Sequence, residues 1–435
     1  MTETLRLGDH CYKIGSGATP RGGKETYSDD GPVALIRSQN VYNDRFSHAG
    51  LAFISHEQAA QLQNVEVNDG DVLLNITGDS VARACQVDRT VLPARVNQHV
   101  AIIRPRPERV DPRFLRYFLV TPVMQALMLG LAAAGATRNA LTKSMIEDFR
   151  IPAWPVETQG AIASVLDALD DKIDLNRRMN ETLEAMARAI FKDWFVDFGP
   201  TKAKVEGRAA YLAPELWSLF PNQLDDEDRP LGWRQRPVYG IAEFVNGAAY
   251  KDMHFSAERN GLPVIKIAEL KAGITATTKF TATDLGEKYR IDSGEVLFSW
   301  SGNPDTSIDT FIWDGGPGWL NQHIFRVREN GSTPRAMTYF QLKILRSIFA
   351  EIARNKQTTG LGHVTAADMK RLMVCDPPTP VAGAYEDVAG PSFRRIVQNQ
   401  LQSRTLAGTR DILLPKLMSG EIRVKEAEQE VQAVA

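Results

Sequence analysis

The sequence predicts an α+β fold in which two similar α/β domains are separated by two long helices packed as an antiparallel coiled coil. The main support for this fold is an internal pseudo-two-fold repeat. Residues 70–78, GDVLLNITG, return as GEVLFSWSG at residues 294–302, and the Asn-Gln-His of residues 97–99 returns at 321–323, each 224 residues later. Helix-like stretches further along each copy repeat at a spacing of 223 residues. A period of this length is the size of a whole folding unit rather than of a solenoid repeat.

Residues 1–155 are expected to form the first domain of this repeat. Short β-branched runs bounded by turn residues predict strands at residues 33–36, 72–76 and 99–103. Residues 112–131 are predicted to form one helix, because the large apolar residues there fall on one side. The prolines of residues 151–155, IPAWP, are expected to end the domain, since they continue neither a helix nor a strand ladder.

A long helix is predicted for residues 156–198, which contain no proline before the end and no glycine after Gly160. Its seam steps alternately by four and three residues, which is a heptad pattern held for about four and a half heptads. The seam residues are Ile162, Leu166, Leu169, Ile173, Asn176, Asn180, Leu183, Ala187, Ile190 and Trp194. Some forty residues at ~1.5 Å each make a helix of roughly 60 Å, which needs a partner along its length. A helix buried along one face only is the simpler alternative.

The second half of the chain repeats this order. A connecting segment at residues 199–230 leads to a second domain at residues 231–380. Residues 381–424 are expected to form the second long helix, which pairs with the first, and residues 425–435 a flexible tail. The two helices are expected to lie antiparallel because a globular domain separates them in the sequence.

Polar residues interrupt the expected seam at Asn176, Asn180, Asn399 and Ser403. Buried amides at such positions lower the stability of a helix pair but select one register. A small error in the helical phase would instead place these asparagines in solvent.

Composition sets mild limits on function. The chain has 435 residues and a net charge of −2, whereas a nucleic-acid-binding domain is usually strongly basic, so DNA binding would need partner subunits that add positive charge. Five arginines gather within thirteen residues; a solvated face is the simpler interpretation, and phosphate contact is the alternative. They are Arg104, Arg106, Arg109, Arg113 and Arg116.

Cysteine usage and the apolar stretches indicate a cytoplasmic protein that does not cross a membrane. Cys11, Cys85 and Cys375 are scattered and form no CxxC pair, which favours reduced thiols. The N-terminus lacks the apolar run of a signal peptide. The most apolar stretch, residues 118–134, contains Pro122 and is shorter than a membrane span, so a buried helix is expected there.

The sequence carries no recognisable catalytic or metal-binding motif. Residues 15–24, GSGATPRGGK, resemble a phosphate-binding loop but have the wrong glycine spacing and Glu25 in place of the Ser or Thr that binds magnesium. Residues 376–379, DPPT, resemble a DNA methyltransferase motif but lack the aromatic residue that stacks a flipped base. His99 and His323 have no partner at metal-ligand spacing. We therefore expect no catalytic residue, no metal and no cofactor in this chain.

Two long motifs resemble one known family. Residues 151–200, from IPAWPVETQG to FKDWFVDFGP, are similar to the central conserved region of the specificity subunit of type I restriction-modification enzymes. Residues 410–422, RDILLPKLMSGEI, resemble the distal conserved region of that family. The Gly-x-Thr-Pro of residues 17–20 and the two repeated motifs resemble landmarks of its target recognition domains. The second half departs from the family pattern, because Asn246 to Tyr250 replace the Gly-x-Thr-Pro opening.

This resemblance implies a DNA-recognition subunit rather than an enzyme. Each target recognition domain would read one half of a bipartite, asymmetric DNA target, and the helices would set the gap between the halves. Two methyltransferase subunits that carry S-adenosylmethionine would bind the conserved regions and methylate adenine at N6. Restriction subunits would then join and cleave DNA, using ATP and Mg. Base flipping would belong to the methyltransferase subunits.

Candidate DNA-binding residues were chosen for side chains that can bond base edges or phosphates from predicted loops and strand ends. In the first half they are Thr19, Arg21, Lys24, Arg37, Asn40, Asn75, Thr77, Arg83, Arg138 and Lys143. In the second half they are Tyr250, Lys251, Lys266, Trp300, Asn303, Lys356, Gln357 and His363. The Asn-Gln-His motif is expected to be structural, because a motif common to both halves cannot distinguish two different DNA sequences.

The aromatic residues at the end of the first long helix are candidates for binding a partner subunit: Phe191, Trp194, Phe195 and Phe198. Packing within the protein itself is the alternative. Two other functions also stay open at this stage. The chain could itself be a methyltransferase or nuclease, although it has no glycine-rich cofactor loop, or it could be a coiled-coil scaffold that binds only proteins.

Overall fold

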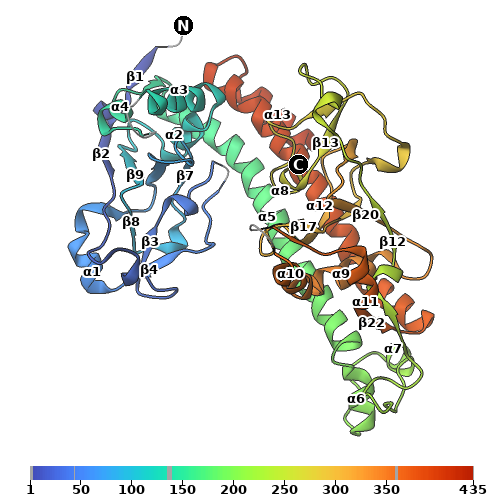
Figure 1. Ribbon diagram of the computed structural model, residues 1–435. Coiled ribbons are helices and arrows are strands. Elements are labelled where there is room, and N and C mark those ends of the chain that lie inside the picture. The colour runs from blue at the N-terminus through green and yellow to red at the C-terminus, as the bar shows by residue number, and fades with distance from the viewer. Residues whose placement is uncertain (1–2, 44, 135–139, 358–360, 435) are drawn as a thin grey trace. The chain divides into compact units, whose positions relative to one another are not determined.

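The computed structural model describes residues 3–43, 45–134, 140–357 and 361–434, and the chain divides into two compact units (Figure 1). Unit 1 comprises Met1–Ile173 and Thr405–Ala435, and unit 2 comprises Asp174–Arg404. The long helices α5 (Val156–Phe195) and α12 (Thr379–Ser419) each contribute one segment to each unit.

Unit 1 holds two four-stranded sheets and one two-stranded sheet. The strand orders are β2-β9-β6-β7, β4-β3-β8-β5 and β1-β10, and all pairs are antiparallel except β3 with β8. The strands are β1 (Thr4–Arg6), β2 (Cys11–Ser16), β3 (Val33–Ile36), β4 (Ala52–Ile54), β5 (Glu66–Val67), β6 (Val72–Asn75), β7 (Ala84–Gln86), β8 (Ala94–Val96), β9 (Val100–Pro105) and β10 (Arg150–Pro152). The helices are α1 (His56–Gln61), α2 (Pro112–Leu119), α3 (Pro122–Ala133), α4 (Lys143–Glu147) and α13 (Val424–Val434). Short 3₁₀ turns cover Leu7–His10, Gly23–Thr26, Ser38–Asn40, Gln63–Val65 and Arg89–Val91.

Unit 2 repeats this strand order, which confirms the internal repeat. Its sheets are β12-β20-β16-β18, β14-β13-β19-β15 and the pair β11-β22, with β13 and β19 parallel as β3 and β8 are. A further antiparallel pair joins β17 to β21. The strands are β11 (Arg234–Pro237), β12 (Glu243–Asn246), β13 (Leu262–Ile265), β14 (Phe280–Thr281), β15 (Arg290–Ile291), β16 (Val296–Ser299), β17 (Ser301–Gly302), β18 (Asp309–Ile312), β19 (Gly318–Leu320), β20 (Ile324–Arg328), β21 (Gly362–His363) and β22 (Met373–Asp376). The helices are α6 (Gly199–Val205), α7 (Pro214–Ser218), α8 (Ile267–Ala272), α9 (Arg335–Ile344), α10 (Arg346–Asn355) and α11 (Ala366–Arg371), with 3₁₀ turns at Val238–Gly240, Asp252–His254 and Glu287–Tyr289.

The repeated Gly-Asp and Gly-Glu motifs have a structural explanation. Gly70 and Gly294 have φ of +84° and +88°, a left-handed backbone that favours glycine before each central strand. The acidic residue that follows then pairs with an arginine of the neighbouring strand. Asp71, which is fully buried, accepts two hydrogen bonds from Arg104 at 2.7 and 2.8 Å, and Glu295 pairs with Arg326.

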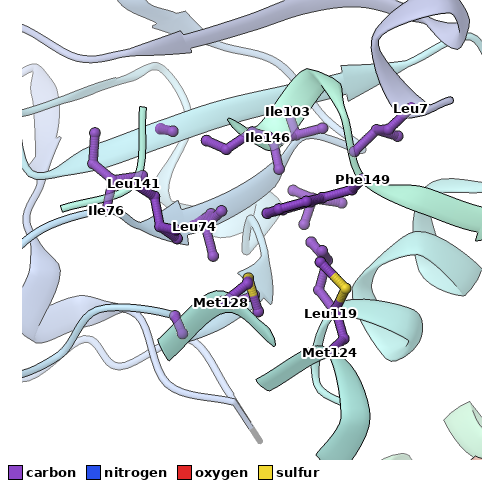
Figure 2. Packing of buried hydrophobic residues seen from close by; sticks show 14 of the residues in the cluster. Leu7, Leu74, Ile76, Ile103, Leu119, Met124, Met128, Leu141, Ile146 and Phe149 are labelled. Atoms are coloured by element: carbon purple, nitrogen blue, oxygen red, sulfur yellow. The ribbon is translucent and has the colours of Figure 1, made fainter. Parts of the chain in front are cut away.

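One hydrophobic core of unit 1 lies between the first sheet and helices α2, α3 and α4, and a second lies around the second sheet. Figure 2 shows Leu74, Ile76 and Ile103 from the strands and their ends packed against residues of the helical side such as Met128 and Phe149. Each is 7% exposed or less. The predicted strands at 33–36, 72–76 and 99–103 are confirmed as β3, β6 and β9.

The predicted helix at residues 112–131 is wrong, because two helices, α2 and α3, occupy this stretch. They are bent by 68° relative to one another. Pro122 cannot donate a backbone hydrogen bond and holds the preceding Thr121 in an extended conformation, at φ −61° and ψ 146°, where its hydroxyl accepts from the backbone of Met124. Among the described helices none alone has the length and apolar character to cross a membrane; α2 and α3 meet that test only as a bent pair.

Three other boundaries also differ from the prediction. Residues 151 and 152 belong to strand β10, where Ile151 pairs with Leu5, so the proline there does not end the ladder. Helix α5 ends at Phe195, three residues before the predicted end, and Phe198 has a left-handed backbone with φ of 55° before α6 begins. The expected flexible tail is a helix, α13, whose Ala427 and Val431 are buried in unit 1. Its apolar residues recur at helical spacing, which the sequence prediction overlooked.

The two long helices pair antiparallel within each unit, as predicted. In unit 2, Asn176 and Asn399 are each 1% exposed, which places them in the seam and excludes the solvent-facing alternative. Asn399 Nδ2 donates to Asn180 Oδ1 at 2.8 Å, and Asn176 Nδ2 donates to Gln402 Oε1 at 3.0 Å. In unit 1, the end of α12 lies beside the start of α5, where the Trp154 indole donates to the carbonyl of Met418 at 3.3 Å.

Candidate functional site

In unit 1 the repeated motifs meet around an open hollow of about 730 Å³. The hollow is lined by Ser38, Gln39, Tyr42, Thr77, Gly78, Asp79, Ser80, Arg83, His99 and Ala140. The Thr77 hydroxyl and His99 Nδ1 are hydrogen-bonded at 2.6 Å. The guanidinium of Arg83 lies 4.9 Å from the ring centre of Tyr42, which holds this long side chain over an aromatic face. Of the predicted residues, the hollow brings together Thr77 and Arg83.

The loops around this hollow are held by close backbone contacts. Gly17 donates to the carbonyl of Val100 at 2.9 Å, and a Cβ on Gly17 would lie 2.1 Å from the carbonyl oxygen of Val96. Asn97 Oδ1 accepts from the backbone of His99 at 3.1 Å. The asparagine of the repeated tripeptide is therefore structural, as predicted, whereas its histidine lines the hollow.

Two predicted residues of the first half point into the protein rather than towards a ligand. Asn40 is fully buried, and its Nδ2 donates to the carbonyls of Ser47 at 2.8 Å and Ala49 at 3.3 Å. Asn75 is also fully buried, and its Nδ2 donates to the carbonyl of Ser38 at 2.8 Å. Both amides hold the loops that shape the hollow, so we leave them out of the proposed interface.

The other predicted residues of the first half have separate positions. Thr19 and Arg21 are exposed on the loop after β2. Arg37 donates to the carbonyl of Gly50 at 2.5 Å, and Lys143 pairs with Glu147 on α4, where it does not line the hollow. Lys24 belongs to the 3₁₀ turn Gly23–Thr26, and Arg138 lies outside the described residues.

Sequence reasoning missed Tyr42 and Gln39, which line the same hollow. Tyr42 stands between two guanidinium groups, those of Arg83 at 4.9 Å and Arg45 at 5.3 Å. An aromatic residue close to arginines in the sequence was the signal that could have identified it.

In unit 2 the corresponding position is built from aromatic rings and histidines. The ring of Trp300 lies 5.5 Å from His323 and 5.9 Å from His363, and its indole donates to Asn246 Oδ1 at 3.0 Å. Ser301 stands where the repeat has Thr77, but its hydroxyl is hydrogen-bonded to His363 at 2.9 Å instead of to the repeated histidine. The two halves therefore present different chemistry on the same frame.

His323 is the most perturbed group at this position. Burial, and then the nearby His363, lower its pKa below the usual value. Its Nδ1 is buried, and among the described residues no group bonds to it. Of the predicted residues, Trp300 and His363 lie together here, and Asn246 was predicted only as part of the altered opening.

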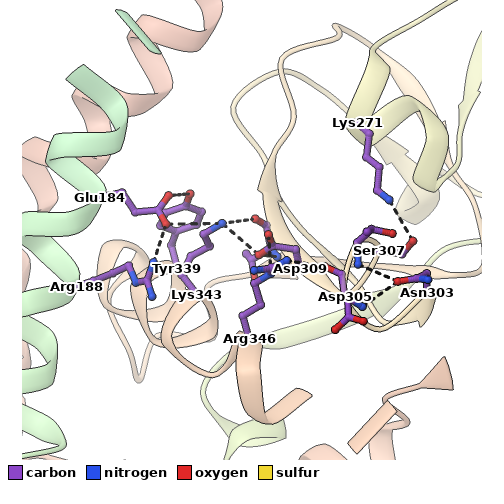
Figure 3. Close-up of polar contacts among 12 residues, drawn as sticks. Glu184, Arg188, Lys271, Asn303, Asp305, Ser307, Asp309, Tyr339, Lys343 and Arg346 are labelled. Atoms are coloured by element: carbon purple, nitrogen blue, oxygen red, sulfur yellow. Dashed lines mark hydrogen bonds and ion pairs between the residues drawn. The ribbon is translucent and has the colours of Figure 1, made fainter. Parts of the chain in front are cut away.

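The remaining predicted residues of unit 2 lie apart from this cluster. Tyr250 is 7% exposed, and burial raises its pKa to about 12. Lys251 and Gln357 are exposed, and the Lys266 ammonium lies 5.0 Å from the ring of Phe255. Lys356 pairs with Asp368 at 2.5 Å. Asn303 is exposed, but its Oδ1 accepts from the backbone of residues 305 and 306, which ties it to its own loop (Figure 3).

The predicted partner-binding aromatics form one cluster in unit 2. Phe191, Trp194 and Phe195 are each 3% exposed or less, and all three rings lie within about 6 Å of Tyr385. Phe191, Phe195 and the half-buried Phe198 nevertheless line a groove of about 340 Å³. The same aromatic residues therefore pack within the protein and line a groove, whose other residues include Glu227, Arg229 and Arg234.

The arginine run of residues 104–116 is not simply a solvated face. Arg104 is paired with the buried Asp71, and Arg116 is 9% exposed and paired with Asp170. Arg113 is paired with Asp111 and Asp167. These three side chains are committed to ion pairs, so the phosphate-contact alternative has no support from them. Within the described ranges, no group of three His, Cys, Asp or Glu side chains could hold a metal ion.

Comparison with known proteins assigns the family. The family model described as type I restriction modification DNA specificity domain matches residues 2–185 and 230–381. The chain belongs to this family. The two matched segments correspond to the two halves of the internal repeat, so the chain carries two copies of the DNA specificity domain.

Two related specificity subunits and one solved structure align with most of this chain. The type I restriction enzyme MjaIX specificity subunit of Methanocaldococcus jannaschii is 27% identical over 338 residues, which is 77% of this chain and 74% of the relative. The HindI specificity subunit of Haemophilus influenzae is 22% identical over 438 residues, 90% of this chain and 94% of the relative. The crystal structure of the S subunit of a type I restriction-modification system from M. genitalium matches with a TM-score of 0.54 and 15% identity over 96% of both chains, which supports the fold.

Proposed function

We propose that unit 1 and unit 2 each read one half of a bipartite, asymmetric DNA target and that the paired helices set the gap between the halves. The chain recognises DNA sequence within a type I restriction-modification system. The observation that carries the two-part proposal is the repeated frame with different side chains at equivalent positions. Unit 1 presents Thr77 and Arg83, whereas unit 2 presents Ser301, Trp300 and His363.

The hollow of unit 1 has the chemistry of base recognition. An arginine guanidinium can donate two hydrogen bonds to guanine O6 and N7, and an amide such as that of Gln39 can pair with adenine. Stacking on Tyr42 reduces the freedom that Arg83 must lose on binding. Thr19, Arg21 and Lys251 are exposed on loops and are proposed to fix the register by contact with phosphates.

We further propose that the chain is a non-catalytic subunit whose partners supply the chemistry. Two methyltransferase subunits would bring S-adenosylmethionine, and restriction subunits would bring ATP and Mg. The groove lined by Phe191, Phe195 and Phe198 is the proposed site for one methyltransferase subunit, because aromatic residues that line a pocket at an interface often dominate binding energy. Such a complex would work in the cytoplasm, where its DNA target is found.

Variants in the two halves test the assignment of half-sites. In a complex with methyltransferase subunits, Arg83→Ala is expected to reduce selectivity for the first half-site by about 10- to 100-fold and to leave the second unchanged. His363→Ala is expected to do the reverse. Arg89→Ala removes an exposed positive charge that does not line the hollow and serves as the control. Selectivity that falls equally at both half-sites in Arg83→Ala would contradict the proposal.

Helix length tests the spacer role separately. Removal of one heptad from each long helix, in register, is expected to change the gap while both half-site sequences stay the same. A scaffold that binds only proteins would show no sequence preference on DNA, with or without methyltransferase subunits. A methyltransferase would bind S-adenosylmethionine as the isolated chain.

A further inference from the structure

In unit 1, helix α2 is attached to both long helices through one carboxylate, Asp170. Arg116 of α2 donates from Nη1 to Asp170 Oδ2 at 2.6 Å, and Arg410 of α12 donates from Nη1 to Asp170 Oδ1 at 2.8 Å. The hydroxyl of Tyr117 donates to the same carboxylate at 2.9 Å. The side chains of Arg116, Asp170 and Arg410 are only 10%, 17% and 18% exposed. We name Arg116, Asp170 and Arg410 the Asp170 cluster.

A second carboxylate extends the same contact. Asp167 accepts from the Tyr117 hydroxyl at 2.9 Å and pairs with Arg113 at 3.1 Å. Arg113 is also paired with Asp111, whose side chain caps the start of α2. The position of α2 along α5 is therefore fixed by directed contacts one turn apart, rather than by apolar contact alone.

Electrostatics favour the charged form of this cluster. Burial alone would raise the pKa of Asp170, but the charges of Arg116 and Arg410 outweigh it and hold the pKa below its usual value. The ring of Tyr117 adds a face for Arg116, 4.3 Å from the guanidinium to the ring centre. Removal of the charge on Asp170 would take away the carboxylate that Arg116 and Arg410 share, and Arg410 would keep its pair with Asp411 at 2.8 Å. Two positive charges that are largely buried would then lie close together with less compensation, which is costly.

The repeat places quite different residues at the same positions in unit 2. At a spacing of 223 residues, Asp170 corresponds to Phe393 and Arg410 corresponds to Ala187. The residues that cap α2 and α9 are Asp111 and Pro334, so Arg116 corresponds to Tyr339 by the same spacing.

Contacts in unit 2 agree with this correspondence. The ring centres of Tyr339 and Phe393 are 5.2 Å apart, where unit 1 has the ion pair of Arg116 and Asp170. Helix α9 instead makes polar contacts with Glu184, which accepts from Tyr339 at 3.4 Å and faces Lys343 at 3.7 Å (Figure 3). Glu386 of α12 also accepts from the backbone of Ala336 at 3.0 Å. Lys343 also pairs with Asp309 at 3.1 Å.

The helix residues that contact α2 in unit 1 do not suit α9, and those that contact α9 in unit 2 do not suit α2. Arg116 beside Phe393 would lose the carboxylate that compensates its buried charge, and Tyr339 beside Asp170 would remove one of the two arginines that neutralise that carboxylate. We propose that the Asp170 cluster positions the first recognition domain on the helix segments of unit 1 and makes that domain fit these segments but not those of unit 2. The cluster so fixes where the first half-site begins relative to the gap. Arg116, Asp170 and Arg410 are positioning residues, and this inference rests on the proposed two-part reading of DNA.

The test measures gap selectivity in the full complex with methyltransferase subunits. Target DNA would carry the normal gap or a gap changed by one base pair, with both half-sites intact. Asp170→Asn keeps the shape but removes the charge, and it is expected to lower the preference for the normal gap by about tenfold, because a domain displaced by an ångström loses its alignment. The sequences of both half-sites should stay the same.

Two variants complete the comparison. Asp174→Asn alters a half-buried carboxylate one turn further along α5, whose ion pairs among the described residues are with Arg177 and Arg178 of the same helix, and should leave gap selectivity unchanged. The triple variant Arg116→Tyr, Asp170→Phe and Arg410→Ala gives unit 1 the residues that unit 2 has at these positions. It should restore the preference for one gap. Where Asp170→Asn does not fold, Arg116→Lys keeps the charge, loses the forked guanidinium and must still reduce the preference.

Different results separate this inference from the proposed function. If folded Asp170→Asn or Arg116→Lys retains the normal gap preference, the positioning role is wrong. If Asp170→Asn changes which half-site sequence is read, the cluster acts on base recognition rather than on position. If the unaltered chain directs methylation to a target without two parts, the proposed function itself fails.

Discussion

The close approach of Gly17 to the strand below it gives the sharpest prediction from the repeat. A Cβ at position 17 would lie 2.1 Å from the carbonyl oxygen of Val96 and 2.3 Å from that of Asn97. Gly247 has the same relation to Asn321 in unit 2, with a nearest approach of 2.2 Å. Both obstacles are backbone atoms, which cannot turn away as a side chain would. In Gly17→Ala the loop must therefore move by about 1 Å.

The expected cost follows from this displacement. Overpacking of a well-packed site costs about 1–3 kcal/mol. For a unit of about 200 residues, each kcal/mol shifts the melting temperature by roughly 2–4 °C, so Gly17→Ala should lower the transition of unit 1 by about 2–12 °C. The loop that carries Thr19 and Arg21 moves with position 17, so selectivity for the first half-site should also fall.

Differential scanning calorimetry of the full chain measures this effect. Gly15→Ala is the matched control, because Gly15 lies two residues earlier, in β2, and no atom lies within 4 Å of the added Cβ. Gly247→Ala should act on unit 2 and on the second half-site alone. A melting curve for Gly17→Ala that matches Gly15→Ala within about 1 °C would refute this explanation of the repeated glycine.

Three further predictions follow from the packing and from the titration of one histidine. Asn176→Leu with Asn399→Leu removes two buried carbonyl oxygens that have no partner among the described residues, so the free energy of unfolding should rise by about 1–3 kcal/mol for each such group, while gap selectivity weakens. Unchanged selectivity would argue against a register role. The lowered pKa of His323 means that its contribution to stability is present above its unfolded pKa of about 6.5 and is lost as the pH falls below that value. When the pH is lowered from 7.5 to 5.5, His323→Gln should therefore lose less stability in thermal melts than the unaltered chain does. Equal losses would contradict this role of His323. Truncation after residue 423 removes α13 with its buried Ala427 and Val431 and should destabilise unit 1, which protease digestion would reveal; equal resistance would show that α13 contributes little.

The features that could be predicted from the sequence are those that depend on local periodicity. The heptad steps placed Asn176 in the seam, and β-branched runs located three strands, because both patterns depend on neighbours within a few residues. The repeat was visible in the sequence because two structural elements allow few other residues. One is the turn glycine followed by its paired acidic residue, and the other is the tripeptide that supports a tight loop. Pro122 should also have split the predicted helix, because the residue before a proline avoids the helical conformation.

The features that were not predictable depend on contacts between distant residues. Nothing local distinguishes Asn40, whose amide is buried, from an asparagine free to contact a base. Arg116 looked like one of five surface arginines until its partners Asp170 and Arg410, far along the chain, closed around it. The hollow of unit 1 likewise joins residues near positions 40, 80 and 99, and only the sheet order brings them together.

The most direct test of the central claim is a map of methylated adenines on random-sequence DNA, made with this chain and methyltransferase subunits that assemble with it. Two different half-sites separated by a constant gap are the predicted result. A single contiguous motif would mean that only one unit reads DNA. A stable, cofactor-loaded complex that methylates no defined sequence would contradict the recognition role of both units.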